Sequence, residues 1–170
     1  MFMASHKGFV MLAALLLASP SWGQGLGLEI QKPEKYRPAG MLILQERTIP
    51  YGIEVSGIYA IRDANDFPNG KRLKLWQEAV NDVKVRNETL RCDTNAPARI
   101  TSNGSQLVML ELNPGGFVGS HNRLSHLIWW AACFPEQAGK DPNNLQAVAR
   151  KLGFSGNLNE REHLLPGNPR

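Results

Sequence analysis

The fold of this chain is restricted most by its single pair of cysteines, Cys92 and Cys133, which lie 41 positions apart. In an oxidising compartment such a pair usually forms one disulfide. Closing a loop of about 40 residues restricts the unfolded chain and is worth about 4 kcal/mol. A redox-active pair would need a thiolate of low pKa, typically in a C-x-x-C motif. The spacing therefore predicts a structural disulfide, with a thiol-based redox protein as the weaker alternative.

The amino terminus indicates that the chain reaches such a compartment. Lys7 precedes the uncharged run GFVMLAALLLA at residues 8–18, and Pro20 then leads to a cleavage-type sequence ending at Gly23. This order is typical of a secretory signal peptide. The run is shorter than the roughly 20 apolar residues that cross a bilayer. We expect residues 1–23 to be removed and the protein to act outside the cytoplasm, in a periplasm, a lumen or the medium; a retained anchor is the alternative.

The rest of the chain has the length of one domain. About 147 residues follow the leader, close to the commonest domain size. Residues 24–39 are rich in Gly, Pro and charge, which predicts an extended lead-in, whereas residues 40–154 carry the patterns of a single domain. Residues 155–170 are polar and predict a flexible tail. No later apolar run is long enough to span a membrane, so no integral membrane segment is expected after cleavage.

The charge pattern argues against nucleic acid as a partner. The net charge is +4, and basic residues alternate with acidic ones along the sequence. A nucleic-acid-binding protein usually concentrates basic residues in a stripe, with aromatic side chains placed to stack on bases. The densest basic cluster is Lys71, Arg72 and Lys74. It supports at most a mild attraction to anionic surfaces.

Helical spacing appears in three segments. Leu73, Trp76, Val80 and Val83 predict an amphipathic helix over residues 72–85. A strand through Leu73 and Leu75 is the weaker alternative.

The other two predicted helices follow residue 119. One begins at Ser120 or Asn122, ends at Cys133, and is apolar nearly all round, which is typical of a buried helix. The third begins at Asp141 as its N-cap and ends before Gly153.

Strand patterns complete the fold prediction. Residues 41–44 are a short apolar run, and residues 53–61 alternate in part. Residues 98–101 and 106–112 flank Asn103-Gly104, a pair that favours a tight type I′ turn, so residues 98–112 predict a hairpin. We therefore expect an α+β fold in which a small antiparallel sheet, including the 98–112 hairpin, packs against about three helices and carries one disulfide.

Few residues qualify as a functional site. His121 and His126 are the only histidines near a predicted helix start, and the adjacent Trp129 and Trp130 point in different directions, so one ring could lie in a groove. These four residues are the candidate binding residues. No catalytic set, metal ligand set or cofactor motif is present at a recognised spacing. The glycine-rich residues 115–119 lack the lysine of a phosphate-binding loop, so a plain turn is favoured over an anion site.

Two functional hypotheses follow. The first is an exported, non-enzymatic accessory or binding protein, cross-linked by a disulfide, that docks to a protein partner or a small ligand. The alternative is a small extracytoplasmic hydrolase that uses His121 or His126 with a loop carboxylate, for which Asp63, Asp66 and Asp93 are available. A histidine within hydrogen-bond reach of an acid beside a pocket would favour the alternative.

Overall fold

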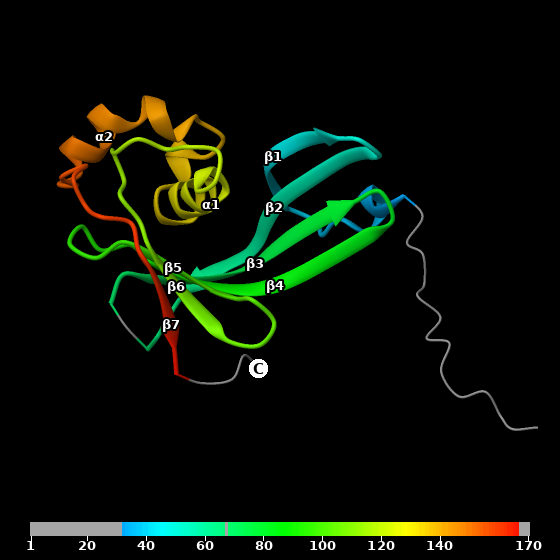
Figure 1. Cartoon of the computed structure of the whole chain (residues 1–170), viewed down its shortest axis with the longest axis horizontal. Coiled ribbons are helices and arrows are strands. Elements are labelled where there is room, and N and C mark those ends of the chain that lie inside the picture. Colours follow the sequence, from blue (N-terminus) through cyan, green and yellow to red (C-terminus); the bar gives the residue numbers. More distant parts are fainter. Residues whose placement is uncertain (1–31, 67, 167–170) are drawn as a thin grey trace, which may run out of the picture.

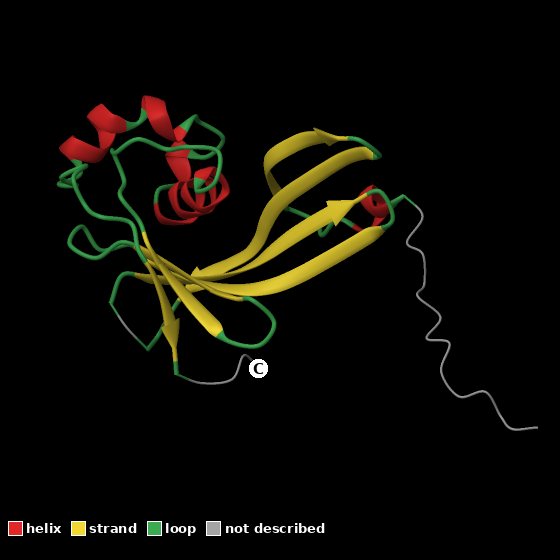
Figure 2. Cartoon of the chain, viewed as in Figure 1, coloured by secondary structure: helices red, strands yellow, loops and turns green. Residues whose placement is uncertain are grey.

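The computed structural model describes residues 32–66 and 68–166, so the predicted signal peptide and most of the lead-in lie outside the described residues. The described chain forms one seven-stranded antiparallel sheet in which the spatial order of the strands is their order in the sequence (Figures 1 and 2). The strands are β1 (Leu42–Ile49), β2 (Gly52–Asp63), β3 (Gly70–Ala79), β4 (Asp82–Arg91), β5 (Ala98–Ser102), β6 (Leu107–Glu111) and β7 (Glu162–Leu165).

Two-residue turns join β1 to β2 and β3 to β4. Residues 50–51 connect β1 to β2, closing on the pair Ile49 and Gly52, and residues 80–81 connect β3 to β4, closing on Ala79 and Asp82. Two-residue connections of this kind fix the register of antiparallel neighbours. Burial alternates over part of β3, where Leu73 and Leu75 are buried while Lys74 between them is exposed.

Bulges bend the sheet. The register shifts between Ile43 and Gln45 in β1, and again between Tyr59 and Arg62 in β2, where Ala60 has a φ of 52°. An inserted residue bends its strand and increases its twist. As a result β1 and β2 curve up on the side of the sheet where the helices lie (Figure 2).

Apart from one 3₁₀ turn before β1, the helical segments of the described residues all lie in the connection between β6 and β7. They are α1 (Arg123–Cys133), α2 (Gln146–Lys151) and the 3₁₀ turns η2 (Pro135–Gln137) and η3 (Pro142–Asn144). α1 packs on the concave face of the sheet, and its apolar side chains form one core with buried residues of the strands, Leu44, Ile58, Leu73, Leu75 and Leu90. Because α1 is only 11 residues long, about 16 Å, it covers one end of the longer strands and leaves their hairpin end uncovered.

The segment before β1 closes the other face at the hairpin end. Pro33–Tyr36 forms the 3₁₀ turn η1, and the next residue, Arg37, donates hydrogen bonds to both carboxylate oxygens of Glu78, at 3.0 Å from its Nε. Trp76 donates its indole N–H to the same carboxylate at 2.7 Å. Burial alone would raise the pKa of Glu78, but the hydrogen bonds from Arg37 and Trp76 outweigh it and hold that pKa below its usual range.

The expected fold class is wrong. Within residues 32–66 and 68–166 the chain forms a seven-stranded sheet with two α-helices, of which only α1 exceeds six residues. It does not form a small sheet against about three helices. The predicted helix at residues 72–85 is the β3–β4 hairpin. Its apparent helical stripe arose because Leu73 faces α1 while Trp76 is buried on the opposite face, beneath the Arg37 segment.

The third predicted helix is shorter than expected. Asp141 caps the turn η3 by accepting a hydrogen bond from the backbone N–H of Asn143, and the α-helix begins only at Gln146.

The 98–112 hairpin is confirmed as β5 and β6. Its loop has four residues, and within it the Asn103 side chain accepts hydrogen bonds from the N–H groups of Ser105 and Gln106. Part of the expected tail forms β7, which pairs with β6.

Candidate functional site

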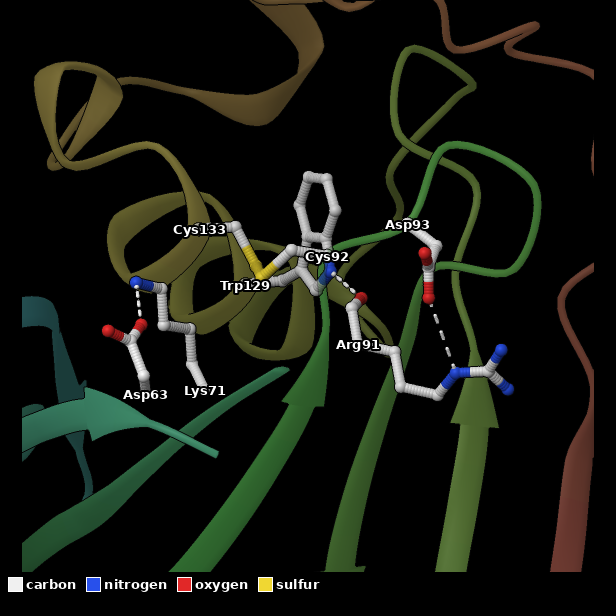
Figure 3. The surroundings of a disulfide bond; sticks show 7 residues. All are labelled: Asp63, Lys71, Arg91, Cys92, Asp93, Trp129 and Cys133. Atoms are coloured by element: carbon white, nitrogen blue, oxygen red, sulfur yellow. Dashed lines mark hydrogen bonds and ion pairs between the residues drawn. A yellow bond between two sulfur atoms is a disulfide. The ribbon is translucent and has the colours of Figure 1, made fainter. Parts of the chain in front are cut away.

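The disulfide predicted from the sequence is confirmed. Cys92 and Cys133 are bonded, with their Cα atoms 5.6 Å apart, and they join the end of β4 to the end of α1 (Figure 3). The indole N–H of Trp129 donates to the carbonyl oxygen of Arg91 at 2.8 Å, next to this bond. The same two elements are therefore tied by one covalent and one polar contact.

Both candidate tryptophans are core residues. Trp129 and Trp130 are buried, with ring centroids 5.2 Å apart in an edge-to-face arrangement, and Phe134 and Phe154 complete the cluster. Such aromatic pairs stabilise a core by about 0.5–1.5 kcal/mol beyond the area they bury. Neither ring lies in a groove, so these two residues hold α1 in place.

The two candidate histidines lie in different settings. His126 is wholly buried on α1, and its Nε2 lies 2.6 Å from Oε1 of Glu160. His121, before the helix, is exposed, and its ring lies against the backbone of Gly119. The structure therefore pairs one histidine with a carboxylate and leaves the other at the surface.

Glu160 collects several hydrogen bonds. Its Oε2 accepts from the amide of Asn122 at 2.6 Å, and its Oε1 accepts from the backbone N–H of Asn113 at 3.1 Å as well as from His126. A carboxylate only accepts, so the proton of the shared hydrogen bond is placed on Nε2 of His126. Burial by itself would raise the pKa of Glu160, but the hydrogen bonds from His126 and Asn122 prevail and lower it.

A small hollow adjoins this group. It has a volume of about 250 Å³, and its wall includes His121, Asn122, Ser125 and Glu160. His126 lies behind that wall, and its Nδ1 has no hydrogen-bond partner among the described residues. Ser125 is already engaged, because its hydroxyl accepts from Arg99 at 2.9 Å. The arrangement holds a histidine and a carboxylate together without a hydroxyl nucleophile in contact with the imidazole in the described part of the chain.

The acids expected beside a histidine lie elsewhere. Asp63, Asp66 and Asp93 pair with Lys71, Arg72 and Arg91 respectively, at 2.6, 2.7 and 3.7 Å. The acid that the structure brings to His126 is Glu160, which sequence reasoning missed. It stands 34 positions from His126 in a polar stretch without periodicity, so no local pattern could have indicated it.

A second surface feature lies at the end of the sheet farthest from the helices. We use "hairpin tip" for Tyr51, Ile53 and Val80, which are 85%, 58% and 42% exposed. Tyr51 is in the β1–β2 turn, and Val80 is in the β3–β4 turn with its side chain against Gly52. The three exposed apolar side chains therefore lie in or next to two neighbouring turns, which approach each other where Val80 meets Gly52.

Two classes of site are not found in the described part of the chain. No group of three or more His, Cys, Asp or Glu side chains there could hold a metal ion. No helix within residues 32–66 and 68–166 has the length and apolar character to cross a membrane. A search against known protein families, characterised proteins and solved structures gave no match to this chain.

Proposed function

We propose that this protein is an exported, non-enzymatic accessory protein that docks to a protein partner through the hairpin tip. The observation that carries the proposal is the exposure of Tyr51, Ile53 and Val80 at two neighbouring turns. Single exposed apolar side chains are ordinary on protein surfaces, whereas grouped ones mark interaction sites. Tyrosine is also among the residues enriched where proteins bind one another.

The position of the hairpin tip supports this role. The long strands β1–β4 carry it away from α1 and α2, so a partner could approach it without meeting the helices (Figure 1). The strands are held at their opposite end by the disulfide and the aromatic core. A surface presented on a rigid support loses little conformational entropy on binding, which favours affinity.

Export is supported by the intramolecular disulfide. Disulfides persist in oxidising compartments outside the cytoplasm and are rare in the cytosol. Two features thus support an extracytoplasmic location: the predicted signal peptide, which lies outside the described residues, and the disulfide that the structure contains.

The proposal is tested by recovering the tagged full-length protein from the producing cell and analysing what is retained with it. We expect a specific partner to be retained by the wild type and lost from Tyr51→Ser and Ile53→Ser. Phe117→Ser is the matched control, because Phe117 is similarly exposed but lies outside the hairpin tip. Retention of the partner by all variants, or recovery of the isolated monomer alone, contradicts the proposal.

One observation favours the alternative, a small extracytoplasmic hydrolase. The His126–Glu160 contact of 2.6 Å next to the hollow joins a base to an acid that could orient it. If the protein hydrolyses p-nitrophenyl acetate, Glu160→Gln should abolish turnover while His163→Ala, on β7, should not. If Glu160→Gln loses hydrolysis and His163→Ala keeps it, the protein is a hydrolase and the accessory role is contradicted. If Glu160→Gln still hydrolyses the ester, His126 and Glu160 are not the site of hydrolysis.

A further inference from the structure

We propose that the convex face of the sheet carries a binding site for a phosphate-bearing ligand, formed by Arg62, Arg72 and Lys74. The three residues line a hollow of about 770 Å³. Side chains alternate between the two faces of a strand. Since Leu73 and Leu75 face α1, Arg72 and Lys74 point to the other side of the sheet.

The bulge in β2 creates this grouping. Tyr59 pairs with Lys74, and in a regular ladder the residue opposite Arg72 would then be Ile61. The extra residue, with Ala60 in the left-handed region at φ 52°, shifts the register so that Arg62 stands opposite Arg72. A bulge is a common way to redirect a side chain next to a site.

The resulting contact is unfavourable for the sheet by itself. Directly opposed residues on antiparallel strands have Cβ atoms about 4.5–5.5 Å apart, and like charges in such pairs destabilise the sheet. Lys74 adds a third cation on the same face, two positions from Arg72. Departures from the local rules of folding are concentrated where a site requires them.

Counter-charges leave the hollow positive. Arg72 donates to Asp66 at 2.7 Å, but the two side chains are 45% and 55% exposed, and ion pairs in contact with solvent are weak. Arg62 and Lys74 form no ion pair within residues 32–66 and 68–166. Glu88 also borders the hollow, yet its carboxylate is buried and held at 2.9 Å on both oxygens by Arg99.

The chemistry of these groups selects a phosphate. A guanidinium offers parallel N–H donors that match phosphate oxygens, and an ammonium adds a compact charge. Asn87 and Thr89 line the same hollow and supply neutral donors. The volume falls in the usual range of small-molecule sites, about 300–1,000 Å³, and exceeds that of one phosphate. The ligand is therefore a phosphate carried on a larger group, either a soluble compound or a lipid headgroup.

This site shares no residue with the hairpin tip, so the result of its test does not depend on the proposed function. The test uses the full-length exported protein in two arms at low ionic strength: calorimetric titration with inorganic pyrophosphate, and flotation with phosphatidylcholine vesicles that contain or lack phosphatidylglycerol. We expect Arg62→Gln and Lys74→Gln each to weaken binding at least tenfold. Lys84→Gln is the matched control, because Lys84 is an exposed lysine on β4 that faces the other side of the sheet.

The outcomes separate the sources of the ligand. Binding of pyrophosphate that depends on Arg62 assigns the site to soluble phosphate compounds. Binding only to phosphatidylglycerol vesicles, with the same dependence, assigns it to a lipid headgroup. Absence of binding in both arms, or equal weakening by Lys84→Gln, overturns the proposal. Thermal melts of each variant ensure that the protein compared is folded.

Discussion

Two buried carboxylates, Glu78 and Glu88, lie on opposite faces of the sheet, and each is neutralised by one arginine. Arg99 meets Glu88 from the neighbouring strand at 2.9 Å, and its remaining N–H groups reach Ser125 on α1. Thr101 donates its hydroxyl to the same carboxylate at 2.8 Å. This group therefore connects the sheet to α1 by polar contacts inside an otherwise apolar layer.

Removing the arginine should be costly. Arg99→Met leaves Glu88 charged and buried, and breaking a buried pair in this way costs about 3–5 kcal/mol. Urea unfolding of the variant should show this loss in the free energy of unfolding. Arg47→Gln, which breaks an exposed pair with Glu54 on β1 and β2, should cost about 0–1 kcal/mol. Equal losses in the two variants would contradict the structural role of the buried pair.

The contact between Glu78 and Arg37 gives a prediction with a defined pH dependence. The pKa of Glu78 is lowered in the folded protein from its ordinary value of 4.5, so its contribution to stability is present above that pH and is lost as the pH falls through the folded pKa. Arg37→Gln should reduce the free energy of unfolding at neutral pH by about 1.5–3 kcal/mol.

Unfolding measured from neutral pH down to about pH 3 checks this expectation. The wild type and Arg37→Gln should converge once Glu78 is protonated. Arg47→Gln, whose partner is exposed, should differ little from the wild type throughout. A constant difference between wild type and Arg37→Gln at every pH would contradict the assignment.

Among the helices and strands, the sequence predicted the ones that are buried on one face only or on nearly all sides. The β5–β6 hairpin has Val108 buried between partly exposed neighbours, and α1 is apolar nearly all round, so both patterns were visible locally. The β3–β4 hairpin was misassigned because its two faces are covered by different partners, α1 near Leu73 and the η1 segment near Trp76. A strand with two partly apolar faces lacks the simple alternation that identifies strands.

The candidate sites show the same limit. Glu160 meets His126, and Arg62 meets Arg72, only through long-range pairing and the β2 bulge. No local pattern encodes such contacts, because each depends on where the chain returns to the sheet. The disulfide was predictable for the opposite reason: two cysteines allow a single intramolecular pairing.

At the scale of the whole molecule, the disulfide should account for a large part of the stability. Its two cysteines are 41 residues apart, and the chain-entropy argument gives about 4 kcal/mol for a closure of that length. The total free energy of unfolding of a native protein is about 5–15 kcal/mol. Reduction with dithiothreitol should therefore lower the urea midpoint strongly.

The doubly substituted Cys92→Ala, Cys133→Ala protein is the control for this measurement. It should unfold at the midpoint of the reduced wild type, and dithiothreitol should not shift it further. The near-ultraviolet circular dichroism of the tryptophans should weaken in both, since Trp129 lies beside the bond. A wild-type midpoint that is insensitive to reduction would show that the bond contributes little.

The sheet follows chain order, and this has a consequence for how the polypeptide acquires its shape. Each of the strands β2 to β6 can pair with the strand that precedes it in the sequence, across a connection of two to six residues. Contacts between sequence neighbours of this kind form quickly. The last strand, β7, is different, because the segment that contains α1 and α2 separates it from β6 in the sequence. Until then the β6 edge offers unpaired backbone groups to any other strand nearby, so the folding chain is most prone to self-association before β7 has paired.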